Sequence, residues 1–165
     1  MSEQQEGATF EELAMPLFDS LYRYARSLAG NRAEAEDLVQ ETFLKGLRGF
    51  GSFTAGTNFR AWMFRILRNT FLTSRSGLRA VPLEDEPELE DKVTPETHFF
   101  QRANRESLQR AIEGLPVAFR EVLTLCDVEN LSYKEIAETL SIPIGTVTSR
   151  LIRARQKLRV ALGES

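Results

Sequence analysis

The chain has 165 residues, of which 42% are hydrophobic and 27% charged, a balance typical of a globular protein with one ordinary domain or two small ones. No apolar run approaches the roughly 20 residues of a membrane helix, and the acidic N-terminal segment MSEQQEGATFEE is unlike a signal peptide. We therefore expect a cytoplasmic protein with no membrane insertion of its own. The single cysteine, Cys126, excludes an internal disulfide, and the single histidine, His98, has no cysteine or second histidine near it, so neither a metal nor a cofactor is expected.

The net charge of −3 conceals long blocks of one sign. Residues 42–83 contain seven cations and no acid, residues 84–91 contain six acids and no cation, and residues 139–163 contain five cations and no acid. Two basic blocks separated by an acidic one indicate two surfaces that contact a polyanion. The simpler alternative is that solvated helix faces happen to be basic.

The first half of the chain has the apolar spacing of helices. We expect a helix over 9–29, a second helix that Asn31 caps and that runs to Arg48, a glycine-rich loop over 49–56, and a third helix over 58–74. The residues expected to face the core are Ala35, Leu38, Val39, Thr42, Phe43 and Leu47 in the second helix, and Phe59, Trp62, Met63, Ile66, Leu67 and Phe71 in the third.

The second half begins with a segment that cannot bury a core. Residues 77–95 combine prolines with the acidic run and predict a flexible linker. Four helices are expected after it, over about 94–113, 116–128, 133–140 and 144–162. The predicted fold is all-α, with two small helical domains, 1–76 and 96–165, joined by the linker 77–95.

The segment LSYKEIAETLSIPIGTVTSRL, which begins at Leu131, predicts a helix-turn-helix. Ser132 and Glu135 form a capping box at the start of its first helix, and small Ala137 allows the two helices to approach closely. The outer face at the start of the second helix would reach base edges in the major groove, and Arg155, Lys157 and Arg159 would continue toward phosphates. A three-helix bundle without a DNA role is the alternative, but it would not require an acid-free outer face. The candidate base-reading residues are Thr146, Thr148, Ser149, Arg150 and Arg153.

Two further faces are predicted in the N-terminal domain. On the second helix, acidic and apolar side chains share one outer face, which is either a docking surface for a basic partner helix or a solvated face. The docking candidates are Asp37, Gln40, Glu41 and Leu44. On the third helix, cations, an aromatic and an amide share an outer face, and this mixture is typical of single-strand binding. The candidates there are Arg60, Phe64, Arg65, Arg68 and Asn69, joined by Phe53 of the loop and by Trp62. Phe59, Trp62 and Phe71 are also explained as core, whereas Phe64 and Phe53 are harder to explain in that way.

The chain resembles the extracytoplasmic-function (ECF) sigma factors, the smallest bacterial sigma factors. The resemblance covers both domains and rests on AEDLVQETFLKGLR, FRAWMFRILRNT, GLPVAFREVLTL and LSYKEIAETLSIPIGTVTSRLIRARQKL. It implies that residues 1–76 are region 2 and that residues 96–165 are region 4. The partners it implies are core RNA polymerase, through the clamp coiled coil of the largest subunit and the flap region, and promoter DNA.

The resemblance also assigns roles to residues. Asp37, Gln40 and Glu41 would bind the clamp coiled coil, and region 4 would read the −35 element as duplex. Where the family often carries a basic residue, this chain has Thr148, which leaves the −35 sequence open. The linker would either thread the nucleic-acid channels of the polymerase or act as a solvated tether. The residues that would capture a flipped base of the −10 element are Phe53, Arg60, Trp62, Arg65 and Asn69.

Members of the family are usually held inactive by an anti-sigma factor, so we expect such a partner in a stress response. The stretches GTNFRAW and DVENLSYKE resemble the branch that is paired with zinc-binding, redox-sensing anti-sigma factors. Cys126 itself lies in an apolar stretch and is expected to be buried and inert.

Two other functions are compatible with parts of the sequence. A helix-turn-helix regulator would bind operator duplex without replacing sigma, and an adaptor would make no DNA contact. An enzyme is disfavoured because the chain has no P-loop lysine in 51–57, no nucleophile–base pair and no metal cluster.

Overall fold

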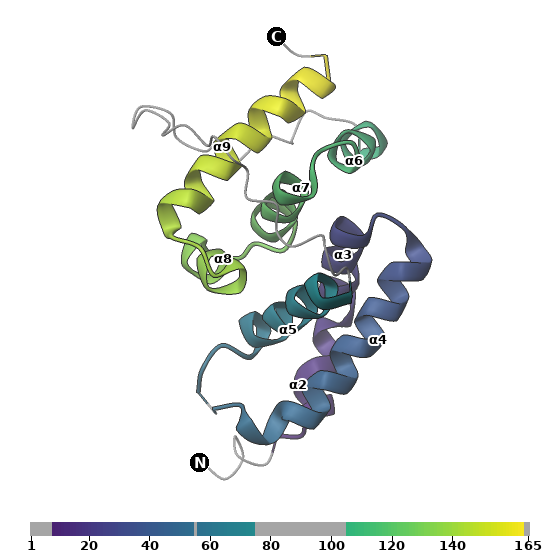
Figure 1. Cartoon of the computed structure of the whole chain (residues 1–165), viewed down its shortest axis with the longest axis vertical. Helices are drawn as coiled ribbons and strands as arrows, with labels where there is room; N and C mark the ends of the chain where they lie inside the picture. The colour runs from purple at the N-terminus through teal and green to yellow at the C-terminus, as the bar shows by residue number, and fades with distance from the viewer. Residues whose placement is uncertain (1–7, 55, 75–104, 164–165) are drawn as a thin grey trace. The chain divides into compact units, whose positions relative to one another are not determined.

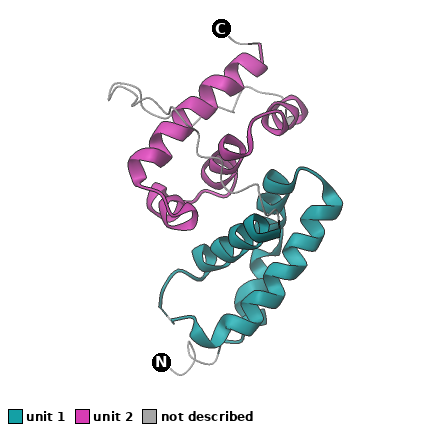
Figure 2. Cartoon of the chain, in the orientation of Figure 1, with its two compact units in different colours: residues 1–79 teal, residues 80–165 magenta. Residues whose placement is uncertain are grey.

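The computed structural model describes residues 8–54, 56–74 and 105–163, and every element within these ranges is helical, as predicted. The chain forms two compact units, residues 1–79 and 80–165 (Figures 1 and 2). The predicted linker 77–95, the predicted helix start at Thr94 and His98 all lie outside the described residues.

The first unit contains four α-helices and two short 3-10 turns in its described part. The predicted first helix is divided, because Pro16 has no backbone N–H to donate and the chain tightens into a 3-10 turn there. The elements are α2 (Phe10–Ala14), η1 (Met15–Leu17), α3 (Phe18–Ala29), α4 (Arg32–Gly49), η2 (Phe50–Ser52) and α5 (Phe59–Ser74).

A tight connection joins α3 to α4, which lie side by side in Figure 1. Gly30 ends α3 at a positive φ of 84°, a conformation that glycine adopts without steric cost. The Asn31 side chain then accepts a hydrogen bond from the Glu34 backbone N–H at 2.9 Å, which confirms it as the N-cap of α4.

The core of the first unit is built by α3, α4 and α5. Gly46 of α4 allows a close approach, because an added Cβ there would stand 2.8 Å from the Phe10 ring and 2.9 Å from the Met63 sulfur. The large apolar side chains buried there include Leu21, Tyr24, Val39, Met63, Phe64 and Leu67.

The second unit contains the predicted helix-turn-helix. Its described elements are α6 (Arg105–Glu113), α7 (Val117–Leu123), the π-helical turn η3 (Thr124–Val128), α8 (Tyr133–Leu140) and α9 (Ile144–Ala161). The helix predicted over 116–128 therefore keeps α-geometry only to Leu123, and η3 widens its last part.

The turn between α8 and α9 forms as the sequence predicts. Ser132 and Glu135 make the reciprocal capping box of α8, with bonds of 3.1 Å and 2.8 Å. Ser141 ends α8 at a positive φ of 56°, and the Ile142 N–H donates to the Ala137 carbonyl at 3.1 Å. The inner face of α9 buries Val147, Leu151, Ala154 and Leu158.

Candidate functional site

The outer face of α4 exposes the predicted docking residues Asp37, Gln40, Glu41 and Leu44. The prediction that Leu47 points inward is wrong, since this side chain is 55% exposed. The inward position at this level is taken by Gly46, against which Phe10 packs. Leu47 therefore adds a second exposed leucine, beside the 48% exposed Leu44, to a face that also carries carboxylates.

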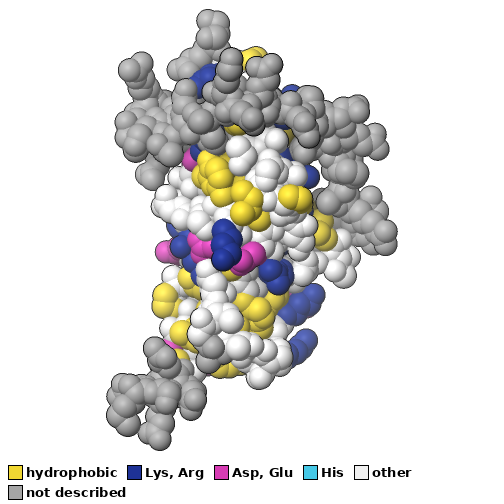
Figure 3. All heavy atoms as spheres, turned by 90° about the vertical axis from the view of Figure 1, so that its left-hand side faces the viewer, with side chains coloured by type: hydrophobic (Ala, Val, Ile, Leu, Met, Phe, Trp, Pro, Cys, Tyr) yellow, Lys and Arg dark blue, Asp and Glu magenta, His cyan; other side chains and the backbone are white. Residues whose placement is uncertain are grey.

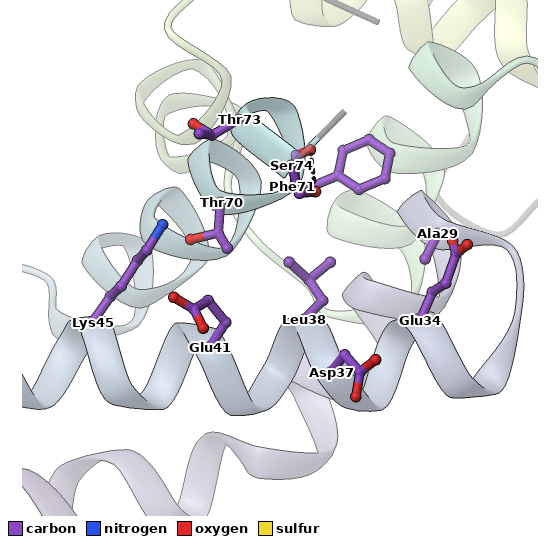
Figure 4. A pocket seen from close by; sticks show the side chains of 10 residues that line it. All are labelled: Ala29, Glu34, Asp37, Leu38, Glu41, Lys45, Thr70, Phe71, Thr73 and Ser74. Carbon is purple, nitrogen blue, oxygen red and sulfur yellow. Dashed lines mark hydrogen bonds between the residues drawn. The ribbon is translucent and has the colours of Figure 1, made fainter. Parts of the chain in front are cut away.

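A cleft of about 470 Å³ lies between α4, α5 and the end of α3. In Figure 4, Glu41 and Lys45 rise from α4 on one side, and Thr70 extends from α5 toward them. The sequence did not indicate this cleft, because its walls come from helices that are brought together only by the tertiary packing. It lies along the α5 side of the predicted docking face, so that face is hollowed rather than flat at this edge. The lining residues are Ala29, Glu34, Asp37, Leu38, Glu41, Lys45, Thr70, Phe71, Thr73 and Ser74.

The outer face of α5 is narrower than predicted. Arg65 and Asn69 are exposed, and Arg60 is half-buried. The prediction that Phe64 and Arg68 lie on this face is wrong, since Phe64 is 0% and Arg68 only 8% exposed. Because α5 packs against both α3 and α4, its buried stripe is wider than one face of an amphipathic helix.

Phe64 instead supports a neighbouring cation. Its ring packs 5.5 Å from the Tyr24 ring in the core. The Arg60 guanidinium carbon lies 5.7 Å from the centre of the same ring, a cation–π distance. The side chain predicted to stack on a base therefore holds an arginine near the surface.

A half-buried aromatic cluster surrounds the loop between η2 and α5. The Phe53 ring stacks on the Phe50 ring, with 6.1 Å between the ring centres, and it packs edge-on against the Phe59 ring, with 5.2 Å between the ring centres. It also lies 5.1 Å from Trp62. Asn58 fixes the start of α5 by accepting a hydrogen bond from the Ala61 N–H at 3.0 Å. Phe53 and Trp62 thus lie together, each partly accessible, as a single-strand surface requires.

The first turns of α9 present the predicted base-reading residues. Thr146, Thr148, Ser149, Arg150 and Arg153 are all partly exposed. The Thr148 hydroxyl donates to the Ile144 carbonyl at 3.2 Å, so toward other groups its oxygen serves best as an acceptor. Ile144, which was not predicted as a functional residue, is 50% exposed at the helix start. The space-filling view shows Lys and Arg side chains beside hydrophobic patches on the face that it draws (Figure 3).

Arg155 does not continue the basic surface of α9. Its residue is only 4% exposed, and its guanidinium binds the Asp127 carboxylate through Nη2–Oδ1 at 2.6 Å and Nε–Oδ2 at 3.3 Å. The prediction that Arg155 points toward phosphates is therefore wrong. The Asp127 carboxylate, which holds the Arg155 side chain inside the unit, lies 28 residues earlier in the chain.

Cys126 lies at the edge of this ion pair, with its Sγ 3.7 Å from Arg155 Nη2. Burial and then the Asp127 carboxylate raise the pKa of the thiol to about 11. At neutral pH only about one thiol in ten thousand is then ionised. Cys126 is only half-buried, so the prediction that it is buried is wrong, and its lack of reactivity stays a prediction that the raised pKa favours.

Within the described ranges, no group of three or more His, Cys, Asp or Glu side chains is arranged to hold a metal ion. Over the same residues, no helix has the length and hydropathy needed to cross a membrane.

Comparison with protein families places both units. Residues 13–80 match the family model for Sigma-70 region 2, and residues 105–158 match that for Sigma-70 region 4. The ECF RNA polymerase sigma factor SigE of Mycolicibacterium smegmatis is 40% identical over 92% of this chain, which spans 64% of that relative's length. The ECF RNA polymerase sigma factor EcfG of Rhodopseudomonas palustris is 35% identical over 87% of this chain and 79% of its own. The ECF RNA polymerase sigma-E factor of Escherichia coli is 33% identical over 76% of this chain and 72% of its own.

Two solved structures are also similar to this chain over more than nine tenths of its length. The sigma factor RpoE from Bartonella quintana, in complex with the anti-sigma factor NepR, matches with a TM-score of 0.73 and 31% identity over 93% of this chain and 96% of that one. CnrH, in complex with the cytosolic domain of CnrY, matches with a TM-score of 0.69 and 27% identity over 98% of this chain and 94% of that one.

Proposed function

Because the chain belongs to the ECF RNA polymerase sigma factors, we propose that it is an alternative sigma factor that binds core RNA polymerase, recognises the −35 and −10 promoter elements and promotes promoter melting. The observation that carries this proposal is the pairing of two units on one chain. One unit presents a helix-turn-helix with a partly exposed recognition helix, and the other presents arginines and aromatic rings on one surface.

The polymerase-docking face is the outer side of α4. Asp37 and Glu41 supply the negative charge, and Gln40 supplies hydrogen-bonding capacity. Exposed Leu44 and Leu47 supply the apolar area that interfaces bury at their centre. We assign this face to the clamp coiled coil of the largest polymerase subunit, with the carboxylates steering a basic helix and the leucines packing against it.

The −10 surface is formed by Phe53, Arg60, Trp62, Arg65 and Asn69. Flipping a base out of the duplex costs a few kcal/mol, and stacking a base on an aromatic ring returns about 1–3 kcal/mol. The partly exposed rings can therefore offset the cost, while the arginines hold the backbone and the amide reads a base edge. Phe64 and Arg68 are excluded from this surface by their burial.

The −35 surface is the start of α9. Arg150 and Arg153 offer guanidinium groups that suit guanine edges or phosphates, and the hydroxyls of Thr146, Thr148 and Ser149 suit several bases. Exposed Ile144 adds an apolar contact suited to a thymine methyl group.

The remaining parts of the proposal concern regulation and location. An anti-sigma factor would hold the chain inactive until a stress signal releases it. This is supported by the similarity to RpoE, whose structure was solved in complex with the anti-sigma factor NepR. The chain would act in the cytoplasm, where the polymerase is, and would catalyse no reaction of its own.

Run-off transcription with purified core RNA polymerase and a library of genomic promoters tests the proposal. The chain should generate transcripts whose start sites share two upstream motifs. Arg150→Glu and Asn69→Ala should abolish these transcripts, whereas the controls Arg110→Glu on α6 and Arg23→Ala on α3, both exposed elsewhere in the same units, should preserve them. Tight duplex binding by the chain alone, without stimulation of core, would instead support a helix-turn-helix regulator.

A further inference from the structure

The buried ion pair in the second unit connects the recognition helix to the turn that precedes the helix-turn-helix. Arg155 belongs to α9 and Asp127 to η3, and their side chains are 4% and 10% exposed. The carboxylate receives two hydrogen bonds from one guanidinium, through both of its oxygens. A two-point contact between planar groups restricts orientation as well as distance.

The π-helical turn is what carries Asp127 to this position. In η3 the Glu129 N–H donates to the Thr124 carbonyl and the Leu131 N–H to the Leu125 carbonyl, both at 2.9 Å. The wider turn places residues 126–128 differently from a continued α-helix, and such single turns recur at functional sites.

Helix α8 reaches the same cluster through its first residue, Tyr133. Burial, and then the Cys126 thiol, raise the pKa of Tyr133, while Arg155 acts in the opposite direction. Arg155 is therefore in electrostatic contact with η3 and with α8, the two elements that precede α9 in the chain.

Burying the Asp127–Arg155 ion pair carries a desolvation penalty. Burial raises the pKa of Asp127 even though Arg155 donates hydrogen bonds to its carboxylate. The pKa of Arg155 is raised in spite of its own burial, because Asp127 accepts those bonds, so the pairing offsets the penalty of burial only in part. In addition, Nη1 of Arg155 is buried and has no hydrogen-bond partner in the part of the chain that the structure describes. Buried ion pairs of this kind can often be replaced by apolar residues without loss of stability.

The rest of the inner face of α9 restricts its rotation through the shape of the packed side chains alone. Val147, Leu151, Ala154 and Leu158 pack through apolar contacts, which have no directional preference. With a helix radius of about 5–6 Å, a rotation of about 20° about the helix axis would move a base-reading atom by about 2 Å. That displacement exceeds the tolerance of a hydrogen bond.

We therefore propose that the Asp127–Arg155 pair fixes the rotational setting of α9, so that Arg155 is a positioning residue for −35 recognition and not a phosphate contact. This inference rests on the proposed function, because it assigns the base-reading face to α9. It predicts that a folded chain without the pair reads the −35 element with less discrimination.

The experiment compares the parent chain with Arg155→Met and with the double variant Asp127→Leu/Arg155→Met, each as full chain. The double variant leaves no buried charge unpaired, so it should fold even where a single change does not. Arg153→Met is the control for loss of a DNA contact, and Arg110→Met on α6 is the control for loss of an exposed arginine elsewhere. Circular dichroism and denaturant titration establish that each variant is folded and how stable it is.

Two measurements then distinguish a role of Arg155 in positioning α9 from a direct contact with DNA and from a contribution to stability alone. The first is binding of holoenzyme to promoter DNA with every single-base change in the −35 element, at several salt concentrations. The second is hydrogen exchange of the α9 amides in the free chain, which requires neither polymerase nor DNA.

The double variant should keep the parent's stability and the parent's salt dependence of promoter binding. The ratio of its affinities for the best and the worst −35 base should be at least threefold smaller than in the parent. Its amides over 144–153 should exchange faster. A double variant that keeps the parent's base preference would overturn the inference. So would a smaller salt dependence in Arg155→Met: for loss of a phosphate contact, as in Arg153→Met, the slope of log binding constant against log salt concentration should fall by about one. If the parent itself shows no −35 preference, the proposed function fails. Hydrogen exchange then decides the positioning role alone, with unchanged exchange over 144–153 counting against it.

Discussion

Replacing Gly46 with alanine tests the packing that turns the docking face of α4 outward. The added Cβ would stand 2.8 Å from the Phe10 ring and 2.9 Å from the Met63 sulfur. Both distances are shorter than real Cβ contacts, and both neighbours are buried, so the helix or the two side chains must shift.

The expected change in the free energy of unfolding is the difference of two effects. Overpacking a tight core costs about 1–3 kcal/mol, whereas exchanging glycine for alanine inside a helix returns up to about 1 kcal/mol. The net expectation is a loss of about 1 kcal/mol, which lowers the melting temperature of a unit of this size by about 4–8 °C.

Gly49 provides the matched control, three residues later on the same helix. A Cβ at Gly49 meets only Trp62, at 3.7 Å, which is ordinary contact. Gly49→Ala should therefore be neutral or slightly stabilising. Thermal unfolding followed by circular dichroism measures both variants. If Gly46→Ala is as stable as Gly49→Ala, the close approach of α4 to Phe10 and Met63 is not present in solution.

Three further predictions follow from single residues. Leu47→Asp should weaken the affinity for core polymerase at least tenfold, whereas the same change at exposed Val160, on the other unit, should leave this affinity unchanged in a fluorescence binding assay. Ser132→Ala removes the capping box of α8 and should cost about 1 kcal/mol in urea unfolding; an unchanged midpoint would show that the cap contributes nothing. Because burial raises the pKa of Cys126 from 9.0 to about 11, the folded chain holds the thiol proton more tightly than the unfolded chain, and this stability is lost as the pH rises from 9.0 to about 11. Over that range the parent should lose more stability than Cys126→Ala, and parallel curves would contradict the raised pKa of the thiol.

The sequence predicted the features that depend on neighbouring residues. Asn31 and Ser132 cap helices through hydrogen bonds to groups three residues away, so their side chains and positions suffice to predict them. The inner face of α9 was also predictable, because one side of this helix packs in a single direction and its apolar residues follow one stripe.

The errors concern residues whose environment is set by distant parts of the chain. Phe64 and Arg68 were placed on the outer face because the spacing of one helix does not show that α5 is covered by two others. Leu47 was placed inside because its pattern does not reveal that Gly46 admits the Phe10 ring. Arg155 was placed outside because its partner, Asp127, is brought near by a π-helical turn that no local pattern indicates.

The central claim is that the chain converts core RNA polymerase into an initiating enzyme. The most direct measurement is the mapping of transcript starts from a pool of genomic promoters, with core polymerase alone and with the purified chain added. We expect new starts only when the chain is present, each preceded by the same two motifs at a fixed spacing. An identical set of starts with and without the chain would contradict the claim.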